Sequence, residues 1–69
     1  MNTTAFIEDN ALKVVIGDER HVTTLAVATK SYAGWRWHSP FGRYGRARFH
    51  TSDEALRAAG RSLGYRVSR

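Results

Sequence analysis

The first half of the chain contains two short runs of apolar and β-branched residues separated by a polar cluster. Residues 11–16 read ALKVVI and residues 22–30 read VTTLAVATK, with the sequence GDER at positions 17–20 between them. β-Branched residues favour strands, and a charged cluster with a glycine is typical of a turn. The pattern therefore predicts an antiparallel hairpin. Alternation places Leu25 and Val27 on one face of its second strand, and Thr24, Ala26 and Ala28 on the other face.

A second hairpin is predicted between residues 34 and 49, which read GWRWHSPFGRYGRARF. The stretch SPFG at positions 39–42 puts Pro at the second and Gly at the fourth position of a type I turn, and this turn followed by a glycine bulge is a three-residue hairpin connection. With Ser39 opposite Arg43, the numbers of paired residues sum to 82. A two-residue loop would exchange the two faces, but type I geometry splays such hairpins and so favours the first register.

One face of this hairpin is predicted to be apolar. Its tryptophans either build the core or stack on nucleic-acid bases, and the core role is favoured because the chain has only two Trp and three Phe. In the favoured register each indole covers a small residue across the ladder, an arrangement that stabilises glycine in a sheet. The predicted pairs are Trp37 with Gly45, Trp35 with Ala47, and Ala33 with Phe49.

The other face is predicted to be cationic, with Arg36 opposite Arg46. Two like charges directly across a ladder destabilise a sheet, by an amount comparable with the ~0.2–1 kcal/mol of a favourable pair. A bound phosphate or carboxylate would reverse that effect, because guanidinium groups bind such anions bidentately. Either the two arginines share an anion or they splay apart into water. The remaining predicted pairs on this face are His38 with Tyr44 and Gly34 with Arg48.

A capped helix is predicted over residues 52–63. The sequence TSDE at positions 51–54 is a capping box, in which Thr51 accepts from the backbone of Glu54 while Glu54 reaches back to Thr51. Gly64 suits the left-handed residue that follows a last helical turn. The apolar residues at helical spacing are Ala55, Leu56, Ala59 and Leu63.

These elements predict an α+β fold, a three- or four-stranded antiparallel sheet packed against one C-terminal helix. All 69 residues form a single small domain. The two ends are left open. Residues 1–10 are either flexible or contribute an edge strand at Thr4 to Ile7, and residues 65–69 are either flexible or extend Tyr65 and Val67 along the sheet edge.

The charge of the chain is basic and unevenly distributed. Eleven Lys and Arg against six Asp and Glu give a formal net charge of +5, and the span from Lys30 to His50 holds five basic residues and no acid. Such a field favours a polyanion or an acidic protein surface as partner, although a basic face also keeps a small protein soluble. The chain has no Cys, no signal-like start and no long apolar run, which predicts a soluble cytoplasmic protein.

Catalytic and metal-binding patterns are not apparent in the sequence. His21, His38 and His50 are irregularly spaced and have no Cys beside them, so a zinc site is not expected. No Ser, His and acid combination has a recognisable spacing, and no glycine-rich phosphate loop occurs. The sequence therefore predicts a protein that is not an enzyme and that uses no cofactor.

Residues 49–55 (FHTSDEA) resemble the F-x-T-x-E-E-A passage of two related groups. These are the ethylene-response-factor DNA-binding domains and the arm-site-binding N-terminal domains of phage-type tyrosine recombinases. Both consist of three antiparallel strands followed by one helix, and both lay the sheet face opposite the helix into the major groove. Over roughly residues 22–64, the resemblance implies a DNA face made of Arg36, His38, Tyr44, Arg46 and Arg48.

In size and Arg-rich composition the chain is also similar to small phage-encoded inhibitor proteins, such as anti-CRISPR proteins and regulators of host RNA polymerase. This likeness implies a protein of the host cytoplasm that occupies an acidic surface of a partner protein, where Arg and aromatic residues dominate affinity.

The first functional prediction is a non-catalytic nucleic-acid-binding module, with DNA preferred over RNA as the partner. The alternative is a phage-type inhibitor or regulator that uses the same face to bind a protein. In both cases the oligomeric state is open and no membrane is involved. The predicted binding residues are Lys30, Arg36, His38, Arg43, Tyr44, Arg46 and Arg48.

Overall fold

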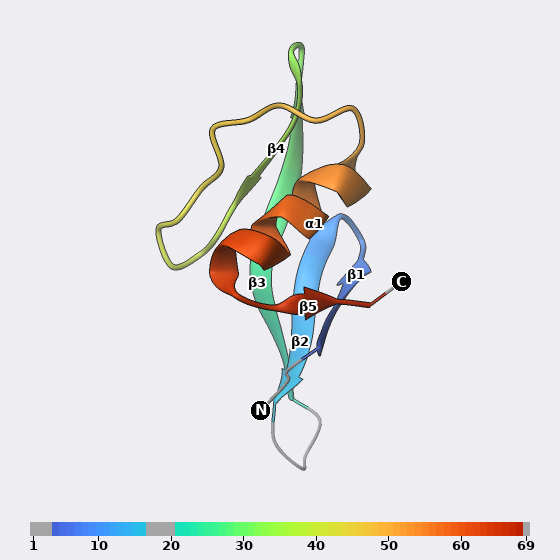
Figure 1. The fold of residues 1–69 in the computed structure, drawn as a ribbon, viewed down its shortest axis with the longest axis vertical. Coiled ribbons are helices and arrows are strands. Elements are labelled where there is room, and N and C mark those ends of the chain that lie inside the picture. The colour runs from blue at the N-terminus through green and yellow to red at the C-terminus, as the bar shows by residue number, and fades with distance from the viewer. Residues whose placement is uncertain (1–3, 17–20, 69) are drawn as a thin grey trace.

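The computed structural model describes residues 4–16 and 21–68, so the turn predicted at residues 17–20 lies outside the described residues. Its elements in chain order are β1 (Thr4–Glu8), β2 (Ala11–Ile16), β3 (His21–Ser31), β4 (Gly34–His38), α1 (Ser52–Leu63) and β5 (Arg66–Val67). Figure 1 shows α1 lying across one face of the sheet, with a wide loop leading to it from β4.

The strands form one sheet in the order β4-β3-β2-β1-β5. Neighbours from β1 to β4 are antiparallel, whereas β5 is parallel to β1. The predicted α+β class, a sheet packed against one C-terminal helix, is therefore confirmed. The strand count differs from the prediction, because β1 and β5 at the two ends of the chain bring the number of strands to five. The parallel pairing of β5 makes this sheet mixed and not purely antiparallel. Residues 43–49, predicted as the second strand of a hairpin, make only two isolated bridges.

The hairpin of β2 and β3 is confirmed, but strict alternation along β3 is wrong at one point. Leu12 pairs with Ala26 and Lys13 pairs with Thr24, so Leu25 is the extra residue of a β-bulge. Both Leu25 and Ala26 are buried as a result. The bulge lets two consecutive residues of β3 contribute to the core, which alternation alone does not allow.

The helix begins and ends as predicted. The backbone N–H of Glu54 donates to Thr51 Oγ1 at 3.1 Å, which confirms the N-cap, and the Thr51 hydroxyl donates to Glu54 Oε1 at 3.4 Å in place of the backbone N–H bond of a full capping box. At the other end Gly64 adopts a left-handed conformation with φ 85°, and its N–H bonds the carbonyl of Arg61. Both caps depend on residues within four positions of the helix, which is why the sequence predicts them.

The core lies between α1 and the sheet. Trp37 is the largest side chain in the buried cluster and only 4% of it is exposed, whereas Trp35 and Phe49 are half-buried at its margin. Small residues of α1 allow the helix to approach the sheet closely. The other buried members are Ala5, Leu12, Val14, Leu25, Ala26, Ala28, Ala55, Leu56 and Ala59.

The C-terminal end folds back along the sheet edge. The N–H of Tyr65 bonds the carbonyl of Gly60 at 2.8 Å, and the N–H of Ser68 bonds the carbonyl of Ala5 at 2.8 Å. Val67 packs directly on Gly60, where a Cβ atom would overlap its Cγ2 methyl. The extended tail at the sheet edge, one of the two alternatives for this end, is thus confirmed as β5.

We expect the two tryptophans to contribute unequally to stability. Trp37→Ala should lose about 3–5 kcal/mol, a large part of the roughly 3–10 kcal/mol available to a domain of this size, because a buried aromatic leaves a cavity. Trp35→Ala should lose less, since Trp35 is only half-buried. Urea denaturation of both variants, with Trp37→Phe as a milder change that keeps the protein measurable, would check this. Equal losses at the two positions would contradict the packing described here.

Candidate functional site

The face of β3 and β4 that α1 leaves uncovered is called the outer face here. Ala28 pairs with Trp37 beneath the helix, and the adjacent pair of Thr29 with Arg36 points the opposite way because side chains alternate along a strand. The same alternation puts His38 on the outer face. Arg36 and His38 are exposed there, as the prediction for a cationic face requires.

The turn that follows β4 is built as predicted. The N–H of Gly42 bonds the carbonyl of Ser39 at 3.1 Å, and the N–H of Ser39 bonds the carbonyl of Arg43. Gly42 has φ 91°, the left-handed conformation expected of the bulge residue. Beyond the turn His38 pairs with Tyr44, so this part of the predicted register is confirmed.

The register then changes by two residues. The N–H of Gly45 still bonds the carbonyl of Trp37, but Trp35 exchanges two backbone hydrogen bonds of 2.8 and 2.9 Å with Phe49. The three residues 46–48 are consequently opposite a single residue of β4, Arg36, and do not continue the ladder. The four predicted pairs that this change overturns are Arg36 with Arg46, Trp35 with Ala47, Ala33 with Phe49, and Gly34 with Arg48.

The reason for the change is the start of β4. Ala33 belongs to the two-residue turn between β3 and β4, so it has no ladder position to offer Phe49. Phe49 pairs with Trp35 instead, which brings its ring against the core cluster. A Cβ at Gly34 would lie 2.7 Å from the carbonyl oxygen of Phe49, so the glycine permits this close approach. Ala33 and Ala47, predicted on the apolar face, are both exposed.

A shift of two residues preserves the face of every side chain, because the strand repeat is two. Trp35, Trp37 and Phe49 therefore remain on the helix side, as the sequence predicts. Trp37 also covers Gly45, since a Cβ there would overlap the indole Nε1. The separation into an apolar and a cationic face survives although half of the register is wrong.

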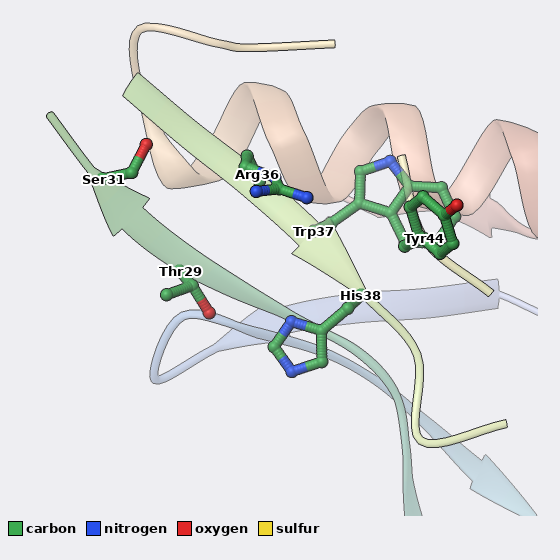
Figure 2. Close-up of a pocket in the computed structure, with 6 residues that line it drawn as sticks. All are labelled: Thr29, Ser31, Arg36, Trp37, His38 and Tyr44. Carbon is green, nitrogen blue, oxygen red and sulfur yellow. The ribbon is translucent and has the colours of Figure 1, made fainter. Parts of the chain in front are cut away.

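Three predicted residues come together in a hollow of about 440 Å³ on the outer face. Arg36 and His38 enter it from β4, and Tyr44, which is 58% exposed, enters it from the returning segment. Figure 2 shows these side chains with Thr29 and Ser31 of β3, while Trp37 and Tyr44 lie at the opposite end of the row from Ser31. Guanidinium, imidazole and hydroxyl groups thus line one open surface.

The other four predicted residues lie outside this hollow. Lys30 is opposite Trp35, which places it on the helix side of β3. Arg43 ends the turn, and Arg46 and Arg48 belong to the segment that leaves the ladder. Arg48 Nη1 donates to the carbonyl of Arg46 at 3.0 Å, and this bond tethers its side chain beside the loop. All four are exposed and can contribute to the field around the hollow.

Thr29 and Ser31 are members of the hollow that sequence reasoning missed. Their position follows from the pairing of β3 with β4, in which Thr29 lies opposite Arg36 and Ser31 opposite Gly34. The signal for that pairing is the two-residue turn at Tyr32 and Ala33, which fixes the register once it is recognised. Ser31 Oγ donates to the carbonyl of Gly34 at 3.0 Å and so closes this turn.

The electrostatic character of the site is purely cationic. None of the residues lining the hollow is acidic, and positions 20–52 of the sequence contain no Asp or Glu. Over residues 4–16 and 21–68, carboxylates pair with Lys13 and Arg57 and with no arginine of the outer face. Charge-assisted bonds from an unpaired guanidinium to phosphate or carboxylate are among the stronger hydrogen bonds in proteins. The site is therefore suited to an oxyanion.

In the described part of the chain, no three His, Asp or Glu residues lie close enough together to hold a metal ion. Within the same residues, no helix has the length and apolarity needed to cross a membrane. Comparison of the chain with protein-family models, curated proteins and solved structures finds no significant match.

Because residues 46–48 leave the ladder, Arg36 and Arg46 are not a cross-strand pair. We expect the changes Arg36→Ala and Arg46→Ala to be additive in unfolding free energy within about 0.3–0.5 kcal/mol, as for residues that do not interact directly. A double-mutant cycle measured by urea denaturation would check this. A larger coupling energy, with the double variant less stable than the sum of the single changes predicts, would restore the directly opposed pair, because each single change would already relieve the repulsion.

The close contact of Trp37 with Gly45 gives a second expectation. Gly45→Ala should destabilise the protein by about 1–3 kcal/mol, because the added methyl must displace a buried indole. Ala47→Ser is the matched control, since Ala47 is exposed and should stay within about 0.5 kcal/mol of the parent. Thermal denaturation followed by tryptophan fluorescence would measure both. A stable Gly45→Ala protein would show that the indole does not rest on this glycine.

Proposed function

We propose that the protein is a non-catalytic nucleic-acid-binding module that uses its outer face, with duplex DNA as the preferred partner. The observation that carries the proposal is the hollow in which Arg36, His38 and Tyr44 converge with two hydroxyl residues of β3. It is open and its lining contains no acid. Thr29, Ser31, Arg36 and His38 line it from the side of β3 and β4 that α1 does not cover, and Trp37 borders it from the helix side. These properties fit an extended polyanion better than a small enclosed ligand.

Each group has a role that its chemistry supports. Arg36 can bind a phosphate or the edge of a guanine bidentately, and Tyr44 can stack on a base or donate to a phosphate. The hydroxyls of Thr29 and Ser31 can donate to phosphate oxygens. The major groove of B-DNA admits a two-stranded β-ribbon, which is the shape of the exposed β3–β4 pair. Arg43, Arg46 and Arg48 would then contact phosphates at the rim.

A second candidate is the binding of an acidic protein surface by the same face, as in an inhibitor or regulator. The observation that favours it is the exposure of aromatic residues beside the arginines: Phe41 is 69% exposed at the turn and Tyr44 is 58% exposed. Aromatic residues and Arg are the side chains that protein interfaces select at their centre. The two candidates differ in the response to nucleic acid at low salt.

Fluorescence anisotropy with random duplex DNA, single-stranded DNA and RNA at two salt concentrations tests the first proposal. Four phosphate contacts on duplex DNA would give a slope of log affinity against log salt near −3.6, about −0.9 per contact. We expect Arg36→Gln to weaken binding roughly tenfold, the loss of about one charge-assisted contact pair. Absence of binding to all three nucleic acids at low salt would contradict the proposal and favour a protein partner.

Lys30→Gln is the matched control for this experiment. It removes the same charge from a neighbouring strand position, but on the helix side of β3. The control variant should lose only the small, salt-dependent part of the nucleic-acid affinity that any surface charge contributes. If Arg36→Gln and Lys30→Gln weakened binding equally, the net charge of the protein and not the outer face would account for the affinity.

A further inference from the structure

A second cationic hollow, of about 370 Å³, lies between the C-terminal half of α1 and β5. Arg57 and Arg61 line it from successive turns of the helix, and Arg66 lines it from β5. Tyr65 and Val67 complete its lining. It is distinct from the candidate site, because β5 and β4 are at opposite edges of the sheet. Figure 1 shows β5 crossing beside the end of α1.

The fold brings these arginines together through the turn that ends the helix. Gly64 takes the left-handed conformation and Tyr65 bonds the carbonyl of Gly60, so the chain reverses at once. The absence of a side chain at Gly60 then allows Val67 to pack on the helix. Pairing of Val67 with Ala5 of β1 fixes β5 in this place. Residue 66 is therefore held next to the helix instead of trailing into solvent.

The charges of the hollow are only partly compensated. Arg57 Nε donates to Asp53 Oδ2 at 2.7 Å, a bond that orients the guanidinium without using its terminal amino groups. In residues 4–16 and 21–68, neither Arg61 nor Arg66 has a carboxylate within ion-pair distance. Three guanidinium groups thus share one hollow with a single acid at its border. Crowded like charges are unfavourable until an anion joins them.

The end of the helix does not supply that anion. Helix C-termini are partly negative because their last carbonyls lack partners, and Arg side chains often serve there as caps. Here Gly64 bonds the carbonyl of Arg61, and Tyr65 bonds the carbonyl of Gly60. Two terminal carbonyls are therefore already satisfied by the backbone, and Arg61 and Arg66 are not needed to cap them.

We propose that this hollow is a second anion site and that its ligand is a phosphate group. Arg61 and Arg66 approach the anion from different elements, and the fixed Arg57 provides a third donor. Guanidinium groups match the geometry of phosphate oxygens, and the half-buried ring of Tyr65 offers a flat surface for a sugar or base attached to the phosphate. The proposal does not depend on nucleic-acid binding by the outer face.

The test is a titration of the labelled protein with inorganic phosphate, pyrophosphate and sodium chloride at matched ionic strength, followed by amide NMR spectra. We expect saturable shifts at residues 57–67 with the phosphates, separate from any shifts at the outer face, and no saturable shifts at residues 57–67 with chloride. The variant Arg61→Gln/Arg66→Gln should weaken the affinity roughly tenfold or more, because it removes two charge-assisted partners. Shifts that do not saturate, or that chloride reproduces, would overturn the proposal.

The matched control is Arg36→Gln/Arg46→Gln, which removes the same charge from the other side of the molecule. It should leave the shifts of residues 57–67 and their saturation unchanged. Equal weakening in both double variants would mean that only net charge matters, and the site would be rejected. The variant Arg61→Lys/Arg66→Lys keeps the charge but loses the guanidinium groups, so an intermediate affinity would confirm that guanidinium geometry contributes to binding. Such an affinity would also show that the loss in the Gln variant is not caused by misfolding.

A further arm identifies the source of the phosphate by comparing a 5′-mononucleotide with a dinucleoside phosphodiester. Tighter binding of the mononucleotide than of the diester would assign a terminal phosphate, and the reverse order would assign a nucleic-acid backbone. Either order supports the site. Failure of both ligands to shift residues 57–67 would overturn it, whatever the result of DNA titrations with the outer-face variants.

Discussion

The contact of Trp37 with Gly45 is the interaction on which the arrangement of this small protein depends. The indole is buried between the sheet and α1, and it also covers the glycine of the returning segment. One side chain therefore joins β4, the helix and the segment that leads to the helix. It also decides which face of β4 is inside. Because side chains alternate, Arg36 and His38 must then lie outside.

This division explains why the protein carries so many uncompensated cations. The helix side takes most of the apolar residues, and Arg36 and His38 of the acid-free span are directed outward. Two arginine-lined hollows result at opposite edges of the sheet, one built by strand pairing and the other by a helix end. Such a distribution is unfavourable for an isolated protein and favourable for one that meets anions. The proposals for both hollows rest on this shared feature.

The sequence predicts what neighbouring residues determine. Both caps of α1, the hairpin of β2 and β3 and the turn at residues 39–42 depend on groups a few positions apart, and all the described ones are correct. The errors are at points where distant elements compete. Phe49 pairs with Trp35 and not with Ala33, because Ala33 lies in the turn before β4. Leu25 is buried because it is the extra residue of a bulge. Thr29 and Ser31 join the hollow through a register set by the turn at Tyr32 and Ala33, a signal that the sequence prediction does not include.

The parallel pairing of β5 with β1 has a consequence for the order of folding. It joins Thr4 with Arg66, almost the full length of the chain apart, whereas the β2–β3 hairpin and α1 need only local contacts. Closing so long a loop costs more entropy than closing a hairpin, so β5 should dock last and open first. The arginine hollow beside it exists only in the completed fold. A phosphate bound there would hold β5 against α1 and would thereby stabilise the position in which β5 pairs with β1.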